Sequence, residues 1–499
     1  MGVIKESHQI SIPIERDFTP KEQSYDAIII GAGMSGLAAA IRLAMYDKKV
    51  LLLEKHTITG GLNSYYARGK RQLDVGLHAL TNYAKKGERK RPLTKLLKQL
   101  RIPYDKLELY SQSESQIAFP EVDLNFNNDI EFLRSEINSK FPDQIIGFDK
   151  LLSFIKEFNE VALDNETFPA KVVVKKYITD PLLLEMIFCP LLIYGSAWEN
   201  DMDFSQFVIM FKSIFLEGFG RPLGGVKKII QLLLEKAKET GVEICYRNGV
   251  DKILTQGDVV TGVETTRGQT LKTKFIMSCA GYPETLNLCQ ELKVTKNQPQ
   301  VGKMSFTETL FTLKKKPKDY GLNKTIIFTN NSSLYHYKRP ESLYDNKSAV
   351  LCLPNNFGVD DYQEGVYRIT LMANYNLWKN IREGNNGKTE YKVKKEEVLK
   401  ESLKIFKTFM PFDDSDITFT DVFTPTTVER YTGHFGGCVY GSPDKSRDGT
   451  TPYQGLYLCG TDQGFLGIVG SMLSGISMAN LHGHMRPSVA PTREVTNGV

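Results

Sequence analysis

Three glycines and a glutamate near the N-terminus have the types and spacing of a nucleotide-binding site. Gly31, Gly33 and Gly36 form a Gly-x-Gly-x-x-Gly motif, and Glu54 follows it along the chain. The first glycine permits a tight turn, the second lets the backbone approach a pyrophosphate, and the third lets a helix pack closely on a strand. The Glu54 carboxylate can accept hydrogen bonds from both ribose hydroxyls, and its charge would repel a 2′-phosphate. The pattern predicts a bound dinucleotide and disfavours NADP.

The elements expected around this motif are those that position it. Residues 25–30 predict a buried parallel strand, residues 37–46 an alanine-rich helix, and residues 49–53 a second buried strand ending at Glu54. A helix that begins at such a turn directs free N–H groups and its positive dipole end at phosphates. The glycine motif alone is weak evidence, and its β-α-β context makes it specific. We therefore expect an α/β fold with a Rossmann-like domain.

The composition is that of an ordinary globular protein. The chain has 499 residues, of which 41% are apolar and 24% charged, so two domains are expected. Its seven cysteines are scattered without a Cys-x-x-Cys pair, which favours a reducing compartment and argues against structural zinc or an iron–sulfur cluster. The N-terminal residues form no apolar stretch of signal-peptide length. We expect a cytoplasmic protein without a bound metal.

Other glycine-rich segments decide between FAD and NAD. They are GGLNS at 60–64, DVGLH at 74–78, RPLGG at 221–225, GLYLCGTD at 455–462 and GIVG at 467–470. Together they resemble the phytoene desaturase, carotenoid isomerase and retinol saturase family of FAD-dependent oxidoreductases, within the flavin amine oxidase superfamily. The resemblance implies FAD as cofactor and a Rossmann-like FAD-binding domain (GR2-type) with an inserted α+β substrate domain.

The same resemblance implies roles for single residues. Gly61 and Ser64 would line the pyrophosphate, and the backbone of Val250 would hold the adenine edge. Asp462 would hold the ribityl chain or the diphosphate. The helix that starts near residues 467–469 would direct its N-terminus at the N1–C2=O edge of the flavin, which suits an anionic reduced flavin.

One residue departs from the family pattern. Many relatives have arginine after the paired glycines, where this chain has Leu62, so a phosphate-neutralising contact is missing or supplied elsewhere. The residues expected to contact the cofactor are Gly31, Gly33, Met34, Ser35, Gly36, Glu54, Lys55, Gly61, Leu62, Ser64, Gly76, Leu77, His78, Val250, Gly460, Asp462, Gly467, Ile468 and Val469.

His78 is a weak candidate for direct chemistry. Its stretch resembles one that passes close to the isoalloxazine ring in retinol saturase, where a histidine can modulate the flavin or donate a proton. The alternative is a packed histidine whose ring is satisfied by backbone. An acidic cluster (Glu199, Asp201 and Asp203) lies in an expected loop, and solvent exposure explains it as well as catalysis does. No catalytic acid or base is assigned from the sequence.

The expected domains are discontinuous. Residues 22–84, 221–300 and 421–485 would form the FAD-binding domain, and residues 85–220 and 301–420 the substrate and membrane-docking domain. The first insertion is expected to be mostly helical, and its aliphatic and aromatic stretches could line a substrate tunnel. The uncharged segment from Gly464 to Gly483 is interrupted by glycines and serines, so we expect a buried helix and no membrane span.

A basic run at residues 85–101 carries eight basic residues and one acid. Leu93, Leu96, Leu97 and Leu100 recur with helical spacing and leave the basic residues on the other side. An anionic membrane surface would attract such a helix, although a solvated helix that packs its leucines on the core explains it equally well. Nucleic-acid binding is disfavoured because no aromatic residues interleave the run.

The resulting functional expectation is an FAD-dependent oxidoreductase of the phytoene desaturase type. It would act as a desaturase, saturase or cis–trans isomerase on a long apolar polyene or isoprenoid lipid such as a carotenoid, drawn from a membrane to which it binds peripherally. The alternatives are a soluble FAD-dependent amine oxidase and a non-catalytic isoprenoid-binding escort protein. No second glycine-rich motif indicates a built-in NAD(P)H site, so quinone, oxygen or an external reductase could exchange electrons with the flavin. The sequence indicates no oligomeric state.

Overall fold

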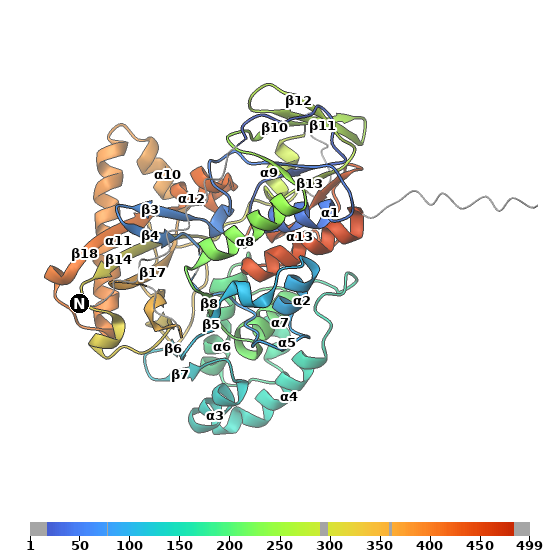
Figure 1. Ribbon diagram of the computed structural model, residues 1–499. Helices are drawn as coiled ribbons and strands as arrows, with labels where there is room; N and C mark the ends of the chain where they lie inside the picture. Colours follow the sequence, from blue (N-terminus) through green and yellow to red (C-terminus); the bar gives the residue numbers. More distant parts are fainter. Residues whose placement is uncertain (1–16, 77, 290–297, 359–361, 484–499) are drawn as a thin grey trace, which may run out of the picture.

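The computed structural model describes residues 17–76, 78–289, 298–358 and 362–483. A parallel sheet with its covering helices forms one part of the molecule, an antiparallel-rich sheet forms a second, and a helical segment lies below both (Figure 1). The mixed α/β class expected from the sequence is confirmed.

The parallel sheet has five strands in the order β19-β13-β1-β2-β9. Their bounds are Ala27–Ile30 (β1), Val50–Leu53 (β2), Glu243–Cys245 (β9), Ile276–Ser278 (β13) and Leu456–Leu458 (β19). Every neighbouring pair is parallel, and all residues of β1 and β2 are buried. Continuous apolar runs such as AIII and VLLL suit strands that are covered on both faces. This sheet is the expected Rossmann-like core.

Helices pack on one face of the parallel sheet, and a smaller sheet packs on the other. Alternate residues such as Ile29 and Leu52 pack against helices, and residues such as Ile28 and Leu51 pack against a smaller sheet. The helices are α1 (Met34–Ala44), α2 (Pro92–Gln99), α8 (Val226–Glu239) and α13 (Gly467–Gly483). The smaller sheet is β10 (Val250–Gln256), β11 (Val259–Thr265) and β12 (Thr270–Lys272), which is followed by β13 and α9 (Tyr282–Asn287).

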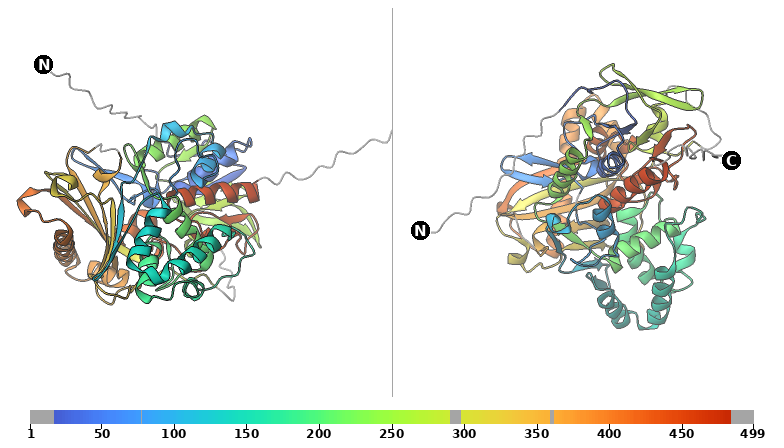
Figure 2. Two further views of the ribbon diagram at one scale, coloured as in Figure 1. Left: turned by 90° about the horizontal axis from the view of Figure 1, so that it is seen from below. Right: turned by 45° about the vertical axis from the view of Figure 1, so that its right-hand side comes forward.

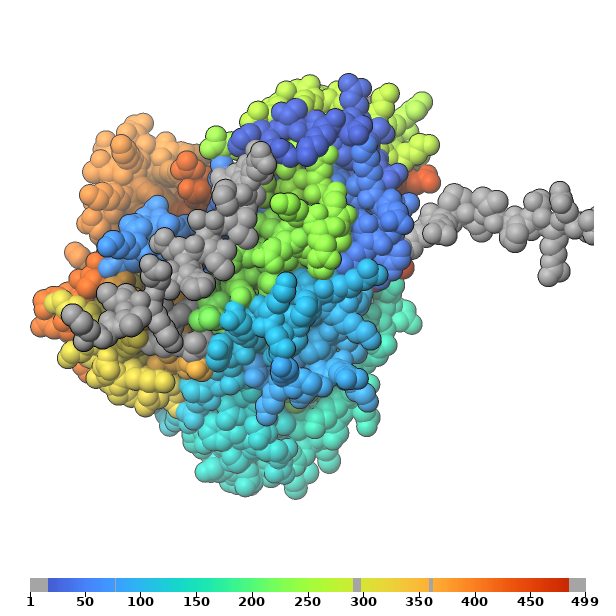
Figure 3. Space-filling view, viewed as in Figure 1, coloured from blue at the N-terminus to red at the C-terminus, as the bar shows by residue number. Residues whose placement is uncertain are grey.

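The position of helix α2 distinguishes between the two interpretations of the basic run at residues 85–101. Leu93, Leu96, Leu97 and Leu100 are buried in the same cluster as α1, α8 and α13. Its basic side is at the surface beside α8 (Figure 3). Of the two interpretations, the helix that packs its leucines on the core agrees with the structure, so the leucine face is not available to a bilayer.

The second sheet has seven strands in the order β18-β14-β17-β16-β15-β6-β7. Their bounds are Ser115–Ala118 (β6), Asp123–Phe126 (β7), Ser305–Leu313 (β14), Ile326–Asn330 (β15), Ser348–Cys352 (β16), Gly365–Ala373 (β17) and Ile417–Phe423 (β18). Helix α11 (Gly387–Phe409) covers one face, and α10 (Tyr375–Glu383) packs beside it. The strands β6 and β7 come from the stretch expected to be mostly helical. They are too short to stand out, and pairing with β15 fixes them.

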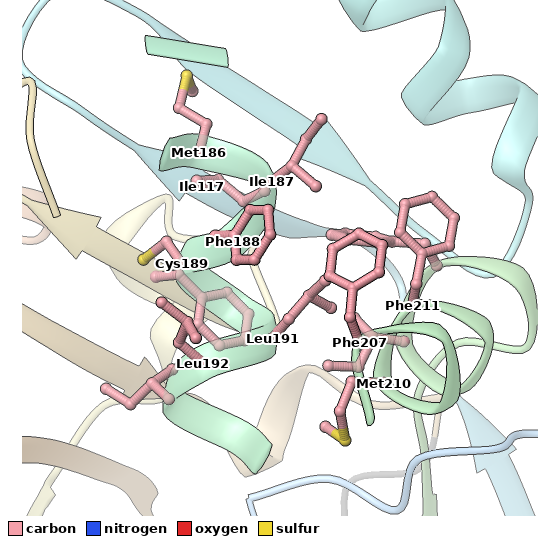
Figure 4. Packing of buried hydrophobic residues seen from close by; sticks show 14 of the residues in the cluster. Ile117, Met186, Ile187, Phe188, Cys189, Leu191, Leu192, Phe207, Met210 and Phe211 are labelled. Atoms are coloured by element: carbon pink, nitrogen blue, oxygen red, sulfur yellow. The ribbon is translucent and has the colours of Figure 1, made fainter. Parts of the chain in front are cut away.

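The helical segment comprises α3 (Ile130–Lys140), α4 (Ile145–Glu157), α5 (Ala170–Val174), α6 (Pro181–Gly195) and α7 (Phe204–Phe211), which continues as a π-helical turn over Lys212–Leu216. It lies beside the seven-stranded sheet (Figure 2). Residues of α6 and α7 pack against one another and against Ile117 of β6 (Figure 4). No helix within the described ranges is both long and apolar enough to cross a bilayer.

Short antiparallel pairs join these parts. The hairpin of β3 (Tyr65–Arg68) and β4 (Arg71–Asp74) contacts the larger sheet, where Oη of Tyr66 donates to Asp421 at 3.2 Å, and β5 (Leu109–Ser111) pairs with β8 (Gly220–Pro222). Helix α12 (Pro425–Thr432) follows β18 and leads back to the parallel sheet.

Glu217, directly after the π-helical turn, makes stability depend on pH. Its Oε2 accepts a hydrogen bond from Nδ2 of Asn82 at 2.7 Å, and burial raises its pKa to about 7. An unfolded glutamate titrates near pH ~4.3. The proton on Glu217 therefore contributes its full stabilisation of the folded state below about pH 4.3. This contribution is lost as the pH rises through 7.

Glu217→Gln is expected to raise the melting temperature at pH 8 and to change it little at pH 5. The amide imitates the protonated carboxyl group, so the gain at pH 8 is at most about 3 kcal/mol. Thermal unfolding followed from pH 5 to pH 8 measures the difference. An equal rise of the melting temperature at pH 5 and at pH 8 would contradict the raised pKa of Glu217.

Candidate active site

The glycine turn between β1 and α1 is built as its sequence requires. Gly31 has φ +94°, and its N–H donates to the Leu53 carbonyl at 2.9 Å. A Cβ on Gly36 would lie 2.0 Å from the carbonyl oxygen of Gly31, so helix and turn touch here. A Cβ on Gly33 would meet nothing within 4 Å and would stand in the cavity that this residue lines. Gly33 thus keeps the space in front of the helix free.

Glu54 closes this cavity from the end of β2. Its Oε2 accepts from the N–H of Ala32 at 2.8 Å, and its Oε1 accepts from the N–H of His56 at 2.7 Å. The residue is 7% exposed. These two bonds fix the carboxylate beside the glycine turn and leave lone pairs for a ligand's hydroxyl groups.

The cavity in front of the turn has a volume of about 330 Å³. It is lined from β1, β2, the start of β10 and the loop after α12. The predicted residues that line it are Gly31, Gly33, Met34, Ser35, Glu54, Lys55, Gly61, Leu62 and Val250. Burial lowers the pKa of Lys55, while Glu54, Glu284 and Glu429 act in the opposite direction. Lys55 lines the same cavity as Leu62, the residue at the position where the sequence lacks an arginine.

A second cavity, of about 200 Å³, lies at the start of α13. The predicted residues that line it are Leu62, Gly76, His78, Gly467 and Ile468. Leu62 lines both cavities, so they are neighbours. The first turn of α13 thus borders the space beside His78, where a helix N-terminus stabilises negative charge.

Besides Ser64, four predicted residues in the described ranges line neither of these two cavities. Asp462 is 2% exposed, and its carboxylate accepts from the N–H groups of Tyr282 (2.6 Å) and Ser442 (2.8 Å) and from Nζ of Lys445 (3.2 Å). Gly36, Gly460 and Val469 also do not line the two cavities, and Leu77 lies outside the described residues. Asp462 thus orders the loops that lead to α13.

Ser64 lines a third cavity, of about 560 Å³, between the β3–β4 hairpin, α11 and α12. Tyrosines and basic side chains surround it, among them Tyr66, Tyr391, Arg68 and Lys395. It shares Leu62, Val75, Phe423 and Val428 with the cavity at α13.

His78 stands among groups from the seven-stranded sheet. Its Nε2 lies 3.1 Å from Oγ1 of Thr370 and 3.4 Å from Oε2 of Glu308. Glu308 is paired with Arg368, and the side chains of Glu308 and Arg368 are only 12% and 2% exposed. The imidazole stacks on the ring of Tyr194 with centroids 5.9 Å apart. Side chains, not backbone, therefore satisfy the ring.

Neighbouring groups stabilise the charged form of Glu308. Burial raises its pKa, but Arg368 and His78 outweigh this effect and hold the pKa below the usual range. No signal in the sequence predicted this group, because Glu308 and Arg368 lie on β14 and β17, far from His78 along the chain.

Asp74, four residues before His78, has a structural role. Its Oδ2 lies 2.6 Å from Nη2 of Arg221, and its Oδ1 accepts from the N–H of Val226 at 3.1 Å. Both side chains of the ion pair are buried, at 6% and 2% exposure. This pair fastens the segment that contains His78 to the RPLGG turn ahead of α8.

Asp74→Asn is expected to destabilise the protein by about 3–5 kcal/mol, because it leaves the Arg221 guanidinium buried without its counter-charge. Urea unfolding measures the loss. Lys86→Gln, which breaks an ion pair with Asp105 whose side chains are 75% and 67% exposed, serves as the control and should change little. Equal unfolding midpoints for the two variants would be evidence against this role of Asp74.

The acidic cluster at residues 199–203 is held by hydrogen bonds within the protein. Glu199 accepts from the N–H of Arg339, and Asp201 from the N–H groups of Lys171 and Met202. Asp203 caps α7 and pairs with Arg447 at 2.9 Å. These carboxylates hold loops around a large cavity of about 730 Å³.

This large cavity lies beside the one at α13. Gly195 and Phe465 line the large cavity, whereas their neighbours Tyr194 and Leu466 line the smaller one. The aliphatic stretches of α6 and α7 are mostly core, and only a few of their residues, Ile193, Tyr194 and Met210, line the cavity at α13.

The residues present fit FAD. The open space over Gly33, the anchored Glu54 carboxylate and the Lys55 ammonium group would hold an adenosine diphosphate moiety. The adjoining cavity at the start of α13 would hold the ring system.

Comparisons with known proteins agree with this geometry. Residues 29–100 match the family model described as an NAD(P)-binding Rossmann-like domain. The chloroplastic prolycopene isomerase of Arabidopsis thaliana is 26% identical, with 92% of this chain and 82% of that protein aligned. All-trans-retinol 13,14-reductase of Danio rerio is 23% identical (95% and 89% aligned), and 1-hydroxycarotenoid 3,4-desaturase of a Flavobacterium is 24% identical (84% and 89%).

The chain is similar to these proteins over most of its length. Solved structures show the same fold. An oxidoreductase from Methanosarcina mazei has a TM-score of 0.65 at 16% identity, covering 91% of this chain and 99% of that one. A putrescine oxidase variant has a TM-score of 0.60 at 14% identity, covering 92% and 98%.

Proposed function

We propose that the protein converts a long polyene or isoprenoid lipid, such as a carotenoid, as a desaturase, saturase or cis–trans isomerase of the phytoene desaturase type. The observation that carries this proposal is the cavity at the start of α13. Its walls are largely apolar or aromatic, with Ile193, Met210, Phe306 and Tyr440 among them. A cavity of this kind accepts a conjugated hydrocarbon, and the Glu308 carboxylate in its wall is already paired with Arg368.

The names of the aligned relatives support the same substrate class. They are an isomerase, a reductase and a desaturase of carotenoids or retinol, and each aligns over most of its length. They differ in the direction of the redox change. Identities of 23–26% do not select one of the three reactions for this chain.

In this proposal the chain's own residues orient the lipid and hold a proton. Bound FAD supplies the capacity to accept or return a hydride. His78 is the group beside the ring site that can give or take a proton, and Thr370 and Glu308 fix the direction in which its Nε2 points. Tyr194 covers one face of the imidazole and excludes water.

The large cavity is the proposed mouth for a membrane lipid. Val161, Leu163 and Val301 line it and are 53%, 53% and 44% exposed. Exposed aliphatic side chains around an opening suit insertion into the interfacial region of a bilayer. Peripheral contact is therefore expected here more than at the leucines of α2, which are buried.

Val161→Asp combined with Leu163→Asp is expected to reduce sedimentation with liposomes severalfold, because two exposed apolar side chains become charged. Lys95→Glu with Lys98→Glu in the basic run is the comparison pair. If the second pair loses binding and the first does not, residues 85–101 and not the mouth form the membrane contact.

The experiment that tests the function begins with the visible spectrum of purified protein. Oxidised and dithionite-reduced forms are then incubated without oxygen with carotenoids in liposomes, and the products are separated by chromatography. We expect a flavin spectrum together with either bleaching by a saturated substrate or cis-to-trans conversion by the reduced form. A flavin spectrum that no polyene changes, together with oxidation of an amine, would establish the amine oxidase alternative. Protein that binds no flavin even after reconstitution would favour the escort alternative.

Phe306→Trp sharpens this test. The residue lines the cavity and is 7% exposed, so a larger ring should narrow the lipid's path and slow conversion while the flavin spectrum persists. Phe306→Leu keeps the site apolar and serves as the matched variant, which should retain conversion.

A further inference from the structure

Two cysteines meet beneath the glycine turn. Cys279 follows β13 and Cys459 follows β19, and their Sγ atoms are 3.1 Å apart. The two strands are parallel neighbours, with Ser278 opposite Leu458, so the cysteines come next in the same register. Both are free thiols in the structure.

The two thiols differ in access. Cys279 is partly exposed and lines the cavity in front of the glycine turn, whereas Cys459 is 3% exposed. A Cβ on Gly36 would lie 3.1 Å from Sγ of Cys279, so this sulfur lies directly under the start of α1. Cys279 does not line the cavity that contains His78, which separates the pair from the proposed chemistry.

We propose that Cys279 and Cys459 form a reversible oxidation site, which hydrogen peroxide closes to a disulfide when the cofactor is absent from its cavity. The proposal concerns the empty cofactor cavity and does not depend on the identity of the lipid substrate.

The backbone geometry allows the bond. Neighbouring strands lie about 4.7–4.9 Å apart. The Cα atoms of a disulfide are usually about 4.4–6.8 Å apart, so residues side by side on parallel strands fall within this range. A bond length of about 2.05 Å then requires the two sulfurs to approach by roughly 1 Å. Small side-chain rotations at both cysteines supply that movement without separating the strands.

The order of the two chemical steps follows from access. Peroxide reaches Cys279 through the cavity and oxidises its thiol to a sulfenic acid with release of one water. Sγ of Cys459 then attacks that sulfur, the S–S bond forms, the S–O bond breaks, and a second water leaves with the Cys459 proton. Two thiols and one peroxide thus give one disulfide and two waters.

Cys459 is the second and not the first nucleophile. The contact with Cys279 and burial both raise the pKa of its thiol well above the usual value, so free Cys459 reacts slowly with an oxidant from solvent. Once Cys279 is oxidised, Cys459 reacts with it inside the same molecule. The short distance between the two sulfurs then makes this second step fast.

A bound cofactor would control the reaction. A dinucleotide in the cavity would cover Cys279, the member of the pair that lines it. Oxidation therefore marks protein that has lost its cofactor. The bond would tie β13 to β19, whose following residues Ala280 and Thr461 line the same cavity.

The test compares the FAD-loaded protein with protein stripped of FAD, each treated with a small excess of hydrogen peroxide. Mass spectrometry of the intact chain and of its peptides measures the loss of two hydrogens and locates the bond. We expect a Cys279–Cys459 cross-linked peptide in the stripped protein, at least tenfold slower formation with FAD bound, and full reversal by dithiothreitol.

Cys279→Ser and Cys459→Ser should each abolish the cross-link. Cys289→Ser removes another buried thiol, whose Sγ contacts the carbonyl of Thr285 at 3.6 Å, and should leave the cross-link intact. The comparison of the FAD-loaded and stripped protein by mass spectrometry uses the natural sequence. Its outcome therefore does not depend on the folding of any variant. Absence of the cross-linked peptide in both states, or equal rates with and without FAD, would overturn the proposal.

Discussion

Glu54→Ala is expected to weaken FAD binding by at least about a hundredfold. Hydrogen bonds to a charged group contribute about 1.5–3 kcal/mol each, and the carboxylate is placed to accept two from a ribose. The substitution also releases the N–H groups of Ala32 and His56, which Glu54 now holds beside the turn. The protein should therefore be purified with little yellow colour.

The measurement is the flavin-to-protein absorbance ratio, followed by titration of the stripped protein with FAD. Glu54→Gln keeps an oxygen for one of these contacts and should fall between alanine and the natural residue. Glu239→Ala at the end of α8, whose side chain is 67% exposed, is the control for a lost surface carboxylate. Stoichiometric FAD in Glu54→Ala would refute the assignment of the first cavity as the adenosine site.

Local sequence predicted the cofactor cavity well because its parts are close together in the chain. The strand, turn, helix and second strand from β1 to β2 form one continuous unit, and each glycine has a task that another residue cannot perform. Glu54 is placed by the end of its strand alone. Such elements need no knowledge of distant contacts.

Asp462 illustrates where a family pattern is less informative than the local contacts. The residue follows β19 as expected, but its carboxylate faces the N–H groups of Tyr282 and Ser442. A pattern fixes the position of a residue in the chain and not the direction of its side chain. That direction depends on loops that arrive from elsewhere.

The basic run shows the same limit for amphipathic helices. Leucines at helical spacing predict an apolar face but not what covers it. In the structure α8 and α13 cover that face, and both come from distant parts of the chain. Strands β6 and β7 were missed for a related reason, since their partner β15 lies about two hundred residues away.

His78 is the residue whose role most needed the structure. The sequence predicted a position near the flavin ring for His78 but favoured a packed histidine as the explanation. The structure surrounds it with Thr370, Glu308 and Arg368, which all lie on β14 or β17. A buried carboxylate beside an imidazole that lines a cavity is an arrangement that supports proton transfer more than packing.

His78→Phe is expected to lower the rate of polyene conversion by about 10²–10⁴-fold, the usual contribution of a positioned acid or base. The phenyl ring keeps the packing on Tyr194, so FAD content and melting temperature should stay close to those of the natural protein. Single-turnover conversion of a carotenoid in liposomes measures the loss. A variant that keeps its full rate would leave His78 as a packing residue only.

Thr370→Val and Glu308→Gln separate positioning from charge. Valine removes the hydroxyl that lies 3.1 Å from Nε2 and should lower the rate without moving the pH profile. Glutamine removes the negative charge that lies 3.4 Å from Nε2, so the pH profile of conversion should move. Because Glu308→Gln also removes the carboxylate that is paired with the buried Arg368 guanidinium, its melting temperature is recorded alongside. Identical pH profiles for all three proteins would mean that no proton passes through His78, and the acid or base would then have to be sought among the tyrosines of the same cavity.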